Sequence, residues 1–240
     1  SRTMIQRGGK NIFQSLGVLN EYMDLQQLDI INGTIDLKLR NNLSVQLEDA
    51  TLSVKSHTLL ESKKLASIKN SLLFLRFSKG IIHAGNLDLR IYDIDYEGNS
   101  GAFKAKNIEV SQKGRTTLLE DIYVRRLVVD EISGDVFAEG VLWNKANIRT
   151  DAFGGGESES SVLLRSVKGK NTTIRGPLNG KNFSANIDEV SFEELNKIPG
   201  KKLVLIGLNL RGKDLSFQDK STRLQIGGFD MADKSTTVLM

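Results

Sequence analysis

The sequence contains no cysteine, which excludes a disulfide framework, a thiolate nucleophile and a zinc site with thiolate ligands. The two histidines, His57 and His83, form no H-x-x-x-H or H-E-x-x-H motif that would bind a metal. The G-x-S-x-G motif of serine hydrolases is also missing. We therefore expect a non-enzymatic protein that carries no cofactor.

Long apolar runs are absent as well. No run approaches the roughly 20 residues of a membrane-spanning helix, and no signal peptide is visible. The chain begins Ser1-Arg2-Thr3 without an initiator Met. We expect it to be a piece of a longer protein whose membrane anchor lies outside these residues.

Neither sign of charge is in large excess, since 33 basic and 29 acidic residues give a net charge of +4. The longest basic clusters are pairs such as Lys63-Lys64, and no aromatic residues are interleaved with them, as a single-strand nucleic-acid platform requires. We therefore expect no nucleic-acid partner. The scattered Lys and Arg fit a solvated surface, or weak attraction to anionic lipid headgroups.

Proline and aromatic residues are scarce, whereas glycine is plentiful: the chain has 2 Pro, 6% aromatics and 22 Gly. Apolar stretches rich in Leu, Ile and Val, separated by Gly, Asn, Asp and Ser, predict a mainly β protein of short strands. Helical spacing of Ile12, Leu16, Leu19 and Met23 predicts a short N-terminal amphipathic helix. One or two helical turns are expected from about Ser62, before a strand near Leu72, and a single turn over residues 193–196.

The one break in composition is the Gly- and Ser-rich segment 151–161, which predicts a flexible loop between two halves. A phosphate-binding loop would need a helix after it, but the strand-like SVLLRSV follows. We expect a helix and lead-in over 1–27, β repeats over 28–150, the loop over 151–161, and β repeats continuing the same sheet over 162–240.

The apolar alternation slips by one residue at the same point of four segments. In LRIYDIDYEG the apolar residues lie on odd numbers up to Ile91 and on even numbers from Ile94. Such a shift turns every later side chain to the opposite face of a strand. The slip recurs between Leu47 and Ala50, between Trp143 and Ile148, and between Ile187 and Val190.

A β-bulge is the simplest physical explanation of each slip, because it adds a residue, bends the strand and increases its twist. Four bulges at equivalent positions predict a long curved open antiparallel sheet built from repeated bulged strands, with one or two short helices. Its apolar face must be covered by closure, by a second layer or by another molecule.

One acidic stretch has a second interpretation. The sequence DIDYEG, starting at Asp93, imitates the opening of a calcium loop, but its twelfth position is Lys104 where a Glu is needed. A strand with outward-facing acids that ends in a turn explains the same residues. The spacing of Asp93 and Asp95 alone does not exclude a glycosidase pair.

The pattern G-x-φ followed by φ-x-φ-x-φ, where φ is apolar, occurs in NGTIDLKLRNNLSVQLEDATLSV and KGIIHAGNLDLRIYDIDYEG. It resembles the repeats of AsmA-like envelope proteins, relatives in architecture of TamB and of the bridge-like lipid-transport proteins, over roughly residues 28–192. The resemblance implies a membrane-anchored protein of the bacterial envelope that faces the periplasm. It also implies a curved sheet whose apolar concave side shields or guides lipid acyl chains, without catalytic residues.

Carried over to this chain, the resemblance implies a lipid-binding face. Its members before each slip are Leu87, Leu89, Ile91, Val141, Trp143, Phe183 and Ile187. Beyond the slip, Ile94, Tyr96, Ile148, Val190 and Phe192 belong to it only if the bulge restores their facing. The same apolar residues also fit the dry core of a structural or adhesive β protein that binds protein or glycan at its surface.

Overall fold

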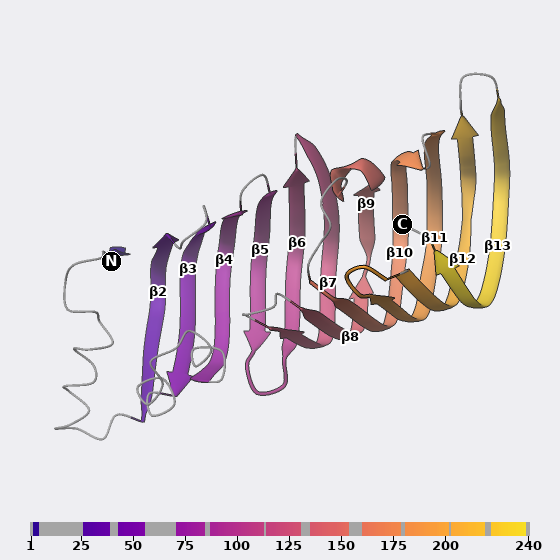
Figure 1. Ribbon diagram of the computed structural model, residues 1–240. Coiled ribbons are helices and arrows are strands. Elements are labelled where there is room, and N and C mark those ends of the chain that lie inside the picture. Colours follow the sequence, from indigo (N-terminus) through magenta and orange to yellow (C-terminus); the bar gives the residue numbers. More distant parts are fainter. Residues whose placement is uncertain are drawn as a thin grey trace.

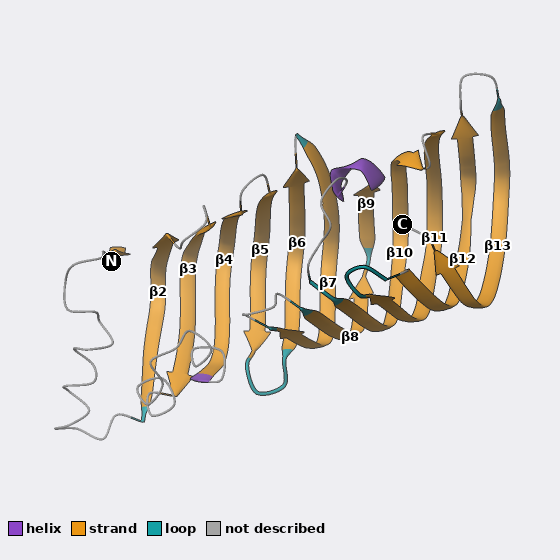
Figure 2. Cartoon of the chain, in the orientation of Figure 1, coloured by secondary structure: helices purple, strands orange, loops and turns teal. Residues whose placement is uncertain are grey.

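The computed structural model describes residues 2–4, 26–38, 43–55, 71–84, 87–112, 114–130, 135–153, 160–178, 181–201, 203–218 and 222–238. Nearly all of them are strand (Figure 2). The strands are β1 (Arg2–Met4), β2 (Gln27–Lys38), β3 (Leu43–Lys55), β4 (Leu72–Ala84), β5 (Leu87–Glu97), β6 (Ala102–Gln112), β7 (Arg115–Val129), β8 (Val136–Trp143), β9 (Lys145–Arg149), β10 (Val162–Leu178), β11 (Lys181–Lys197), β12 (Leu203–Gln218) and β13 (Arg223–Val238).

All 13 strands belong to one open sheet, whose order follows the sequence from β1 to β13. Figure 1 shows them side by side in a single layer, with the lower ends of β10 to β13 turned sharply away from their upper parts. The prediction of a long, curved, open and mainly antiparallel sheet is confirmed. Among the described residues, no helix is long and apolar enough to cross a bilayer.

A backbone irregularity, which we call a bulge, lies at each of the four slips. The register to the neighbouring strand shifts at those near Asp49 and Asp188, and it is unchanged at Asp93 and Asn144. Asp93 and Asp49 adopt left-handed backbone conformations, with φ of 50° and 52°, between the two apolar sets of their strands. The register between β11 and β12 shifts between Ile187 and Glu189. At the remaining slip the chain bends at Asn144, which separates β8 from β9.

The bulges line up across the sheet. Six Asn and Asp residues have φ between 46° and 55°: Asn32, Asp49, Asp93, Asp121, Asn171 and Asp214. The strand registers place the first five at one level, whereas Asp214 lies beside Ala185, further along β12. We call these six the first bulge row. Asn and Asp tolerate this conformation better than other residues with a Cβ. Because the bends share one level, the sheet curves as a whole.

A second bulge row crosses β8, β10 and β12 nearer one end of these strands. It consists of Gly140, Ser166 and Gly207, with φ of 67°, 53° and 68°. The registers of β8, β10, β11 and β12 place these residues level with one another.

Two expectations need correction, and a third lies outside the described residues. The strands are long, at 11 to 17 residues from β5 to β7 and from β10 to β13, because a bulge bends a strand without ending it. Residues 193–196, expected to form a helical turn, belong to β11 and pair with β10 and β12. The helices expected near the N-terminus and from Ser62 lie outside the described residues.

The sheet also contains a parallel strand pairing that was not expected. β10 runs parallel to β8 and β9, with Val162 opposite Val136 and Arg175 opposite Arg149. Residues 150–161 therefore return the chain along the length of a strand, which needs a connection of about a dozen residues. Thr150–Phe153, expected to lie at the start of a flexible loop, form the 3₁₀ helix η1.

Candidate functional site: an open apolar face

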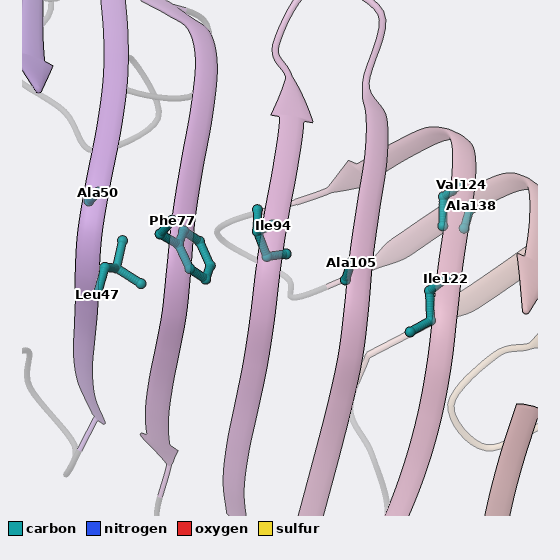
Figure 3. Close-up of a cluster of buried hydrophobic side chains, with 8 residues drawn as sticks. All are labelled: Leu47, Ala50, Phe77, Ile94, Ala105, Ile122, Val124 and Ala138. Carbon is teal, nitrogen blue, oxygen red and sulfur yellow. The ribbon is translucent and has the colours of Figure 1, made fainter. Parts of the chain in front are cut away.

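One face of the sheet carries a continuous apolar surface. Its most buried side chains come from five neighbouring strands, β3 to β7, and from β8 (Figure 3): Leu47, Ala50, Phe77, Ile94, Ala105, Ile122, Val124 and Ala138. Partly buried residues from β2 to β10 extend it, among them Ile35, Leu75, Ile91, Leu119 and Leu164. We call this surface the apolar face.

The bulges keep this face continuous. Ile91 lies opposite Gly80 and Ile94 lies opposite Phe77, so the register of β4 and β5 is preserved across Asp93. Both isoleucines belong to the same apolar cluster although their numbers differ in parity. The extra residue in each strand therefore cancels the slip, and side chains before and after it share a face.

Only some of the side chains on this face are fully shielded from solvent. Thirteen apolar residues of the described chain are fully buried, and five of these are alanines. Nearly all packing among described elements joins neighbours in the sheet, apart from contacts of η1 with β6, β7 and β10. No second sheet or helix layer therefore lies on this face within the part of the chain that the structure describes.

All twelve predicted site residues lie on this face by register and alternation. Ile91, Ile94, Tyr96, Val141 and Trp143 are in the cluster or packed against it. Leu87 and Leu89 alternate with them along β5, and Ile148 pairs with Ile174. Phe183, Ile187, Val190 and Phe192 pair with residues on the same side of β10. The bulges thus restore the facing of those beyond the slip, and their role in lipid binding stays a prediction.

The indole ring of Trp143 packs against the backbone of Gly169, which has no side chain to obstruct it. A Cβ on Gly169 would stand 2.0 Å from Cε2 of the indole, so the ring rests on the glycine backbone. The indole Nε1–H donates to Oγ1 of Thr172 at 2.9 Å, and Thr172 is itself buried. Both partners come from β10, the parallel neighbour of β8.

Tyr96 reports the polarity of this surface. Partial burial among its apolar neighbours raises the pKa of the Tyr96 hydroxyl. Desolvation of a phenol disfavours the charged phenolate, which explains the direction.

No family model, curated protein or solved structure matches this chain.

The opposite face is polar and carries cross-strand ion pairs. Glu48–Lys79 is 3.1 Å long, Glu120–Lys145 is 2.7 Å and Arg165–Glu194 is 2.9 Å. Such pairs favour the correct strand register, although each exposed pair contributes only about 0–1 kcal/mol. The sheet is thus two-faced: one side suits apolar partners and the other suits water or polar ligands.

The acidic stretch at Asp93 is explained by the fold. Asp93 forms a bulge, and Oδ1 of Asp95 accepts a hydrogen bond from Arg76 Nε at 3.1 Å. Within the described ranges, no group of three or more His, Asp and Glu side chains is placed to hold a metal ion.

One acid–base pair occurs on the polar face. His83 Nδ1 lies 2.5 Å from Oδ1 of Asp88, and Ser44 lies opposite His83 on the next strand. The two side chains of the pair are 53% and 49% exposed. A catalytic serine needs a water-excluding site with oxyanion donors, and this half-exposed position on a strand surface does not supply one.

Several residues of the apolar face were not predicted from the sequence. Phe77 lies in a segment that fits both helix and strand spacing, and the alanines Ala105 and Ala138 carry little apolar signal. Their importance comes from cross-strand neighbours, since Ala50 and Ile94 both lie beside Phe77 on β4.

Proposed function

We propose that this chain is a non-enzymatic module that shields or guides lipid acyl chains along its apolar face. The observation that carries the proposal is that face itself: it is continuous across β2 to β10, and only half covered by the described residues. Its lining is mostly Leu, Ile, Val and Phe, with Ala in the centre. Such a lining matches the chemistry of hydrocarbon tails.

The energetics favour occupation of the face. Removing apolar surface from water contributes roughly 25 cal/mol per Å², so covering ~100 Å² of each partner is worth a few kcal/mol. The polar face is a poorer match for tails because it carries charged side chains, among them three cross-strand ion pairs.

The wider setting follows from the resemblance to AsmA-like envelope proteins. We place the module in the bacterial envelope, facing the periplasm, with a membrane anchor elsewhere in the full protein. Lipid headgroups would remain at the open edge of the sheet, where scattered Lys and Arg meet phosphate. These assignments are part of the proposal and rest on the repeat pattern.

Trp143 provides the test, because it is the only tryptophan and lies on the apolar face. The purified chain is titrated with phospholipid carrying brominated tails, below its aggregation concentration, and Trp143 emission is followed. Saturable quenching that unbrominated lipid relieves supports acyl-chain binding. A blue-shifted emission that no lipid quenches would overturn the proposal and favour a structural or adhesive protein.

A matched pair of variants locates the binding. Val190 lies opposite Gly169, the glycine beneath Trp143, whereas Ser191 points to the polar face. Val190→Thr adds a hydroxyl at nearly constant volume, and burying it costs about 1 kcal/mol, or roughly fivefold in lipid affinity. Ser191→Thr should leave the quenching curve unchanged.

A further inference from the structure

We propose that the outer edge of β13 pairs with β13 of a second copy of this chain, in an antiparallel contact that joins the two sheets into one. Strand β13 lies at the end of the sheet, and among the described strands only β12 pairs with it (Figure 1). At the opposite edge, β1 already covers Thr34 to Asp36 of β2. The inference does not rest on the lipid proposal, because it concerns the edge of the sheet and not its apolar face.

The β13 edge lacks the features that natural proteins use to keep sheet edges apart. Protected edges are short, or carry proline or lysine. β13 is 16 residues long, and its segment 223–232 contains neither residue. Leu224, Ile226 and Met231 are 50%, 38% and 43% exposed. A strand partner would cover these side chains and the outward backbone groups of the edge together.

β13 repeats the one-residue slip of the interior strands. Leu224 and Ile226 lie before the slip and Phe229 and Met231 lie after it, with two glycines between them. All four pair with residues on the apolar side of β12, which are Phe217, Leu215, Gly212 and Leu210. The edge strand is therefore built like an interior strand, and it matches a partner strand that carries a slip at the same level.

A second β13 meets that requirement in one antiparallel register. With the two-fold axis between Gly227 and Gly228, Ile226 faces Phe229 of the second copy and Leu224 faces Met231. Each pair occurs twice, as in any isologous dimer. A shift of two residues in either direction leaves a single kind of apolar pair. A two-fold axis normal to the sheet also keeps the apolar side chains of both copies on one side.

The polar side chains of β13 suit the same register. Gln225 faces Asp230 of the second copy, and Arg223 lies diagonal to that Asp230, within reach of a long side chain. Within the described residues, neither Arg223 nor Asp230 belongs to an ion pair. Arg211, opposite Asp230 in the sheet, pairs with Glu189 at 3.0 Å. The dimer would thus bring two opposite charges together, and its symmetry provides this contact twice.

The first test is sedimentation velocity of the full chain, without lipid, over a range of concentrations. The contact involves one strand edge from each copy, which is small for an interface, so we expect a dissociation constant in the micromolar range. More dilute chain is then a monomer with a free β13 edge, and concentrated chain is a dimer and nothing larger. A monomer at every concentration up to about 300 μM would overturn the proposal. Assemblies that keep growing with concentration would also overturn it, because they indicate a head-to-tail contact.

A pair of lysine variants identifies the edge that is used. Ile226→Lys places a charge at the centre of the contact and should weaken the dimer at least about tenfold. Ile31→Lys is the control, since it introduces the same group at a 72% exposed position of β2, and it should change the dissociation constant less than about twofold. An equal effect of the two variants would contradict the assignment to β13. Circular dichroism confirms that each variant is folded.

Disulfide formation tests the register, because the chain has no cysteine of its own. Gln225→Cys and Asp230→Cys place two thiols opposite each other only when one chain of each variant pairs. Residues directly opposite have Cβ atoms about 4.5–5.5 Å apart, whereas position 225 lies about 17 Å from its own symmetry copy, too far for a disulfide. We expect a linked dimer in the oxidised mixture and none in either variant alone. Linkage within a single variant, or none in the mixture, would refute the proposed pairing.

Discussion

At the scale of single residues, the fold depends on Asn and Asp in left-handed conformations inside long strands. The first bulge row places such residues in six strands, and in five of them at one level. A few of their side chains also link neighbouring strands: Ser78 donates to Asp49 Oδ2 at 2.7 Å, and Asn186 donates to Asp214 Oδ2 at 3.3 Å. The backbone preference and the side-chain hydrogen bonds act together to fix the bends.

Asp93 tests this role. Its φ of 50° is costly for a β-branched residue, so Asp93→Val should lower the free energy of unfolding by about 1–2 kcal/mol. Asp93→Gly should stay within about 0.5 kcal/mol of the wild type, since glycine accepts positive φ. Urea unfolding followed by circular dichroism measures both. Asp95→Val, in a normal strand position of β5, is the control, and an equal loss there would refute the assignment.

Substitution of Gly169 tests the packing of the Trp143 indole ring. Gly169→Ala places a methyl group 2.0 Å from the present position of indole Cε2, so the ring must move and lose its hydrogen bond to Thr172. We expect a red shift of Trp143 emission and a loss of about 1–3 kcal/mol, typical of overpacking. Gly114→Ala is a control for glycine replacement, because its Cβ would meet nothing within 4 Å, although its φ of 74° costs some strain. Unchanged Trp143 emission in Gly169→Ala would contradict the packing described here.

At the scale of elements, η1 anchors the one chain reversal that makes β10 parallel to β9. Asp151 of η1 lies 2.9 Å from Arg149 NH2 and 3.2 Å from Arg115 Nε, and its side chain is 9% exposed. These pairs join β7, β9 and η1. The connection that the sequence marked as flexible is therefore tied down at its first turn.

This anchor should be sensitive to acid. The hydrogen bond from Arg149, with the added charge of Arg115, holds the pKa of the Asp151 carboxyl below its usual value. The stabilisation is then complete above the unfolded pKa of about 3.9 and is lost as pH falls through the lower folded pKa. Asp151→Asn should melt at a lower temperature than the wild type at pH 7.

The pH dependence separates this anchor from a packing effect. The difference in melting temperature between Asp151→Asn and the wild type should shrink as the pH is lowered below about 4. Thermal unfolding at pH 7, 4 and 2.5 measures it. If the difference in melting temperature were as large at pH 2.5 as at pH 7, the substitution would act through packing and not through the charge of Asp151.

The sequence predicted those features of the elements that depend on the alternation of side chains within a single strand. The slip at Asp93 predicted a bulge because alternation is visible within one strand. The parallel step at β10 was missed, since strand direction depends on where residues 150–161 carry the chain. The helical turn at residues 193–196 was wrong because pairing with β10 and β12 outweighs a weak local preference for helix.

At the scale of the whole molecule, the candidate site was predicted in outline and missed in its centre. All twelve predicted residues share one face, because two-residue periodicity corrected by the bulges determines facing. Phe77 and Ala105 were missed because their burial depends on cross-strand register, which no single segment encodes.

A single layer in which elements contact mainly their neighbours should unfold as a one-dimensional array. Stability in such arrays is a sum of local terms and nearest-neighbour interfaces. The apolar cluster is centred on β3 to β8, whereas β13 has one neighbour and exposes Leu224 and Met231 by 50% and 43%. Amide exchange should therefore be slowest in β5 to β7 and at least about tenfold faster in β13.

Phe77→Ala tests how far a perturbation travels through this array. Phe77 is 7% exposed and central to the apolar cluster, so its truncation should cost about 3–5 kcal/mol locally. In a one-dimensional array the loss is felt by β4 and its partners β3 and β5, and it fades within a few strands. Hydrogen exchange followed by mass spectrometry should show faster exchange in β3 to β5 and unchanged exchange in β11 to β13. A uniform acceleration across all strands would instead mean that the sheet folds as one cooperative unit.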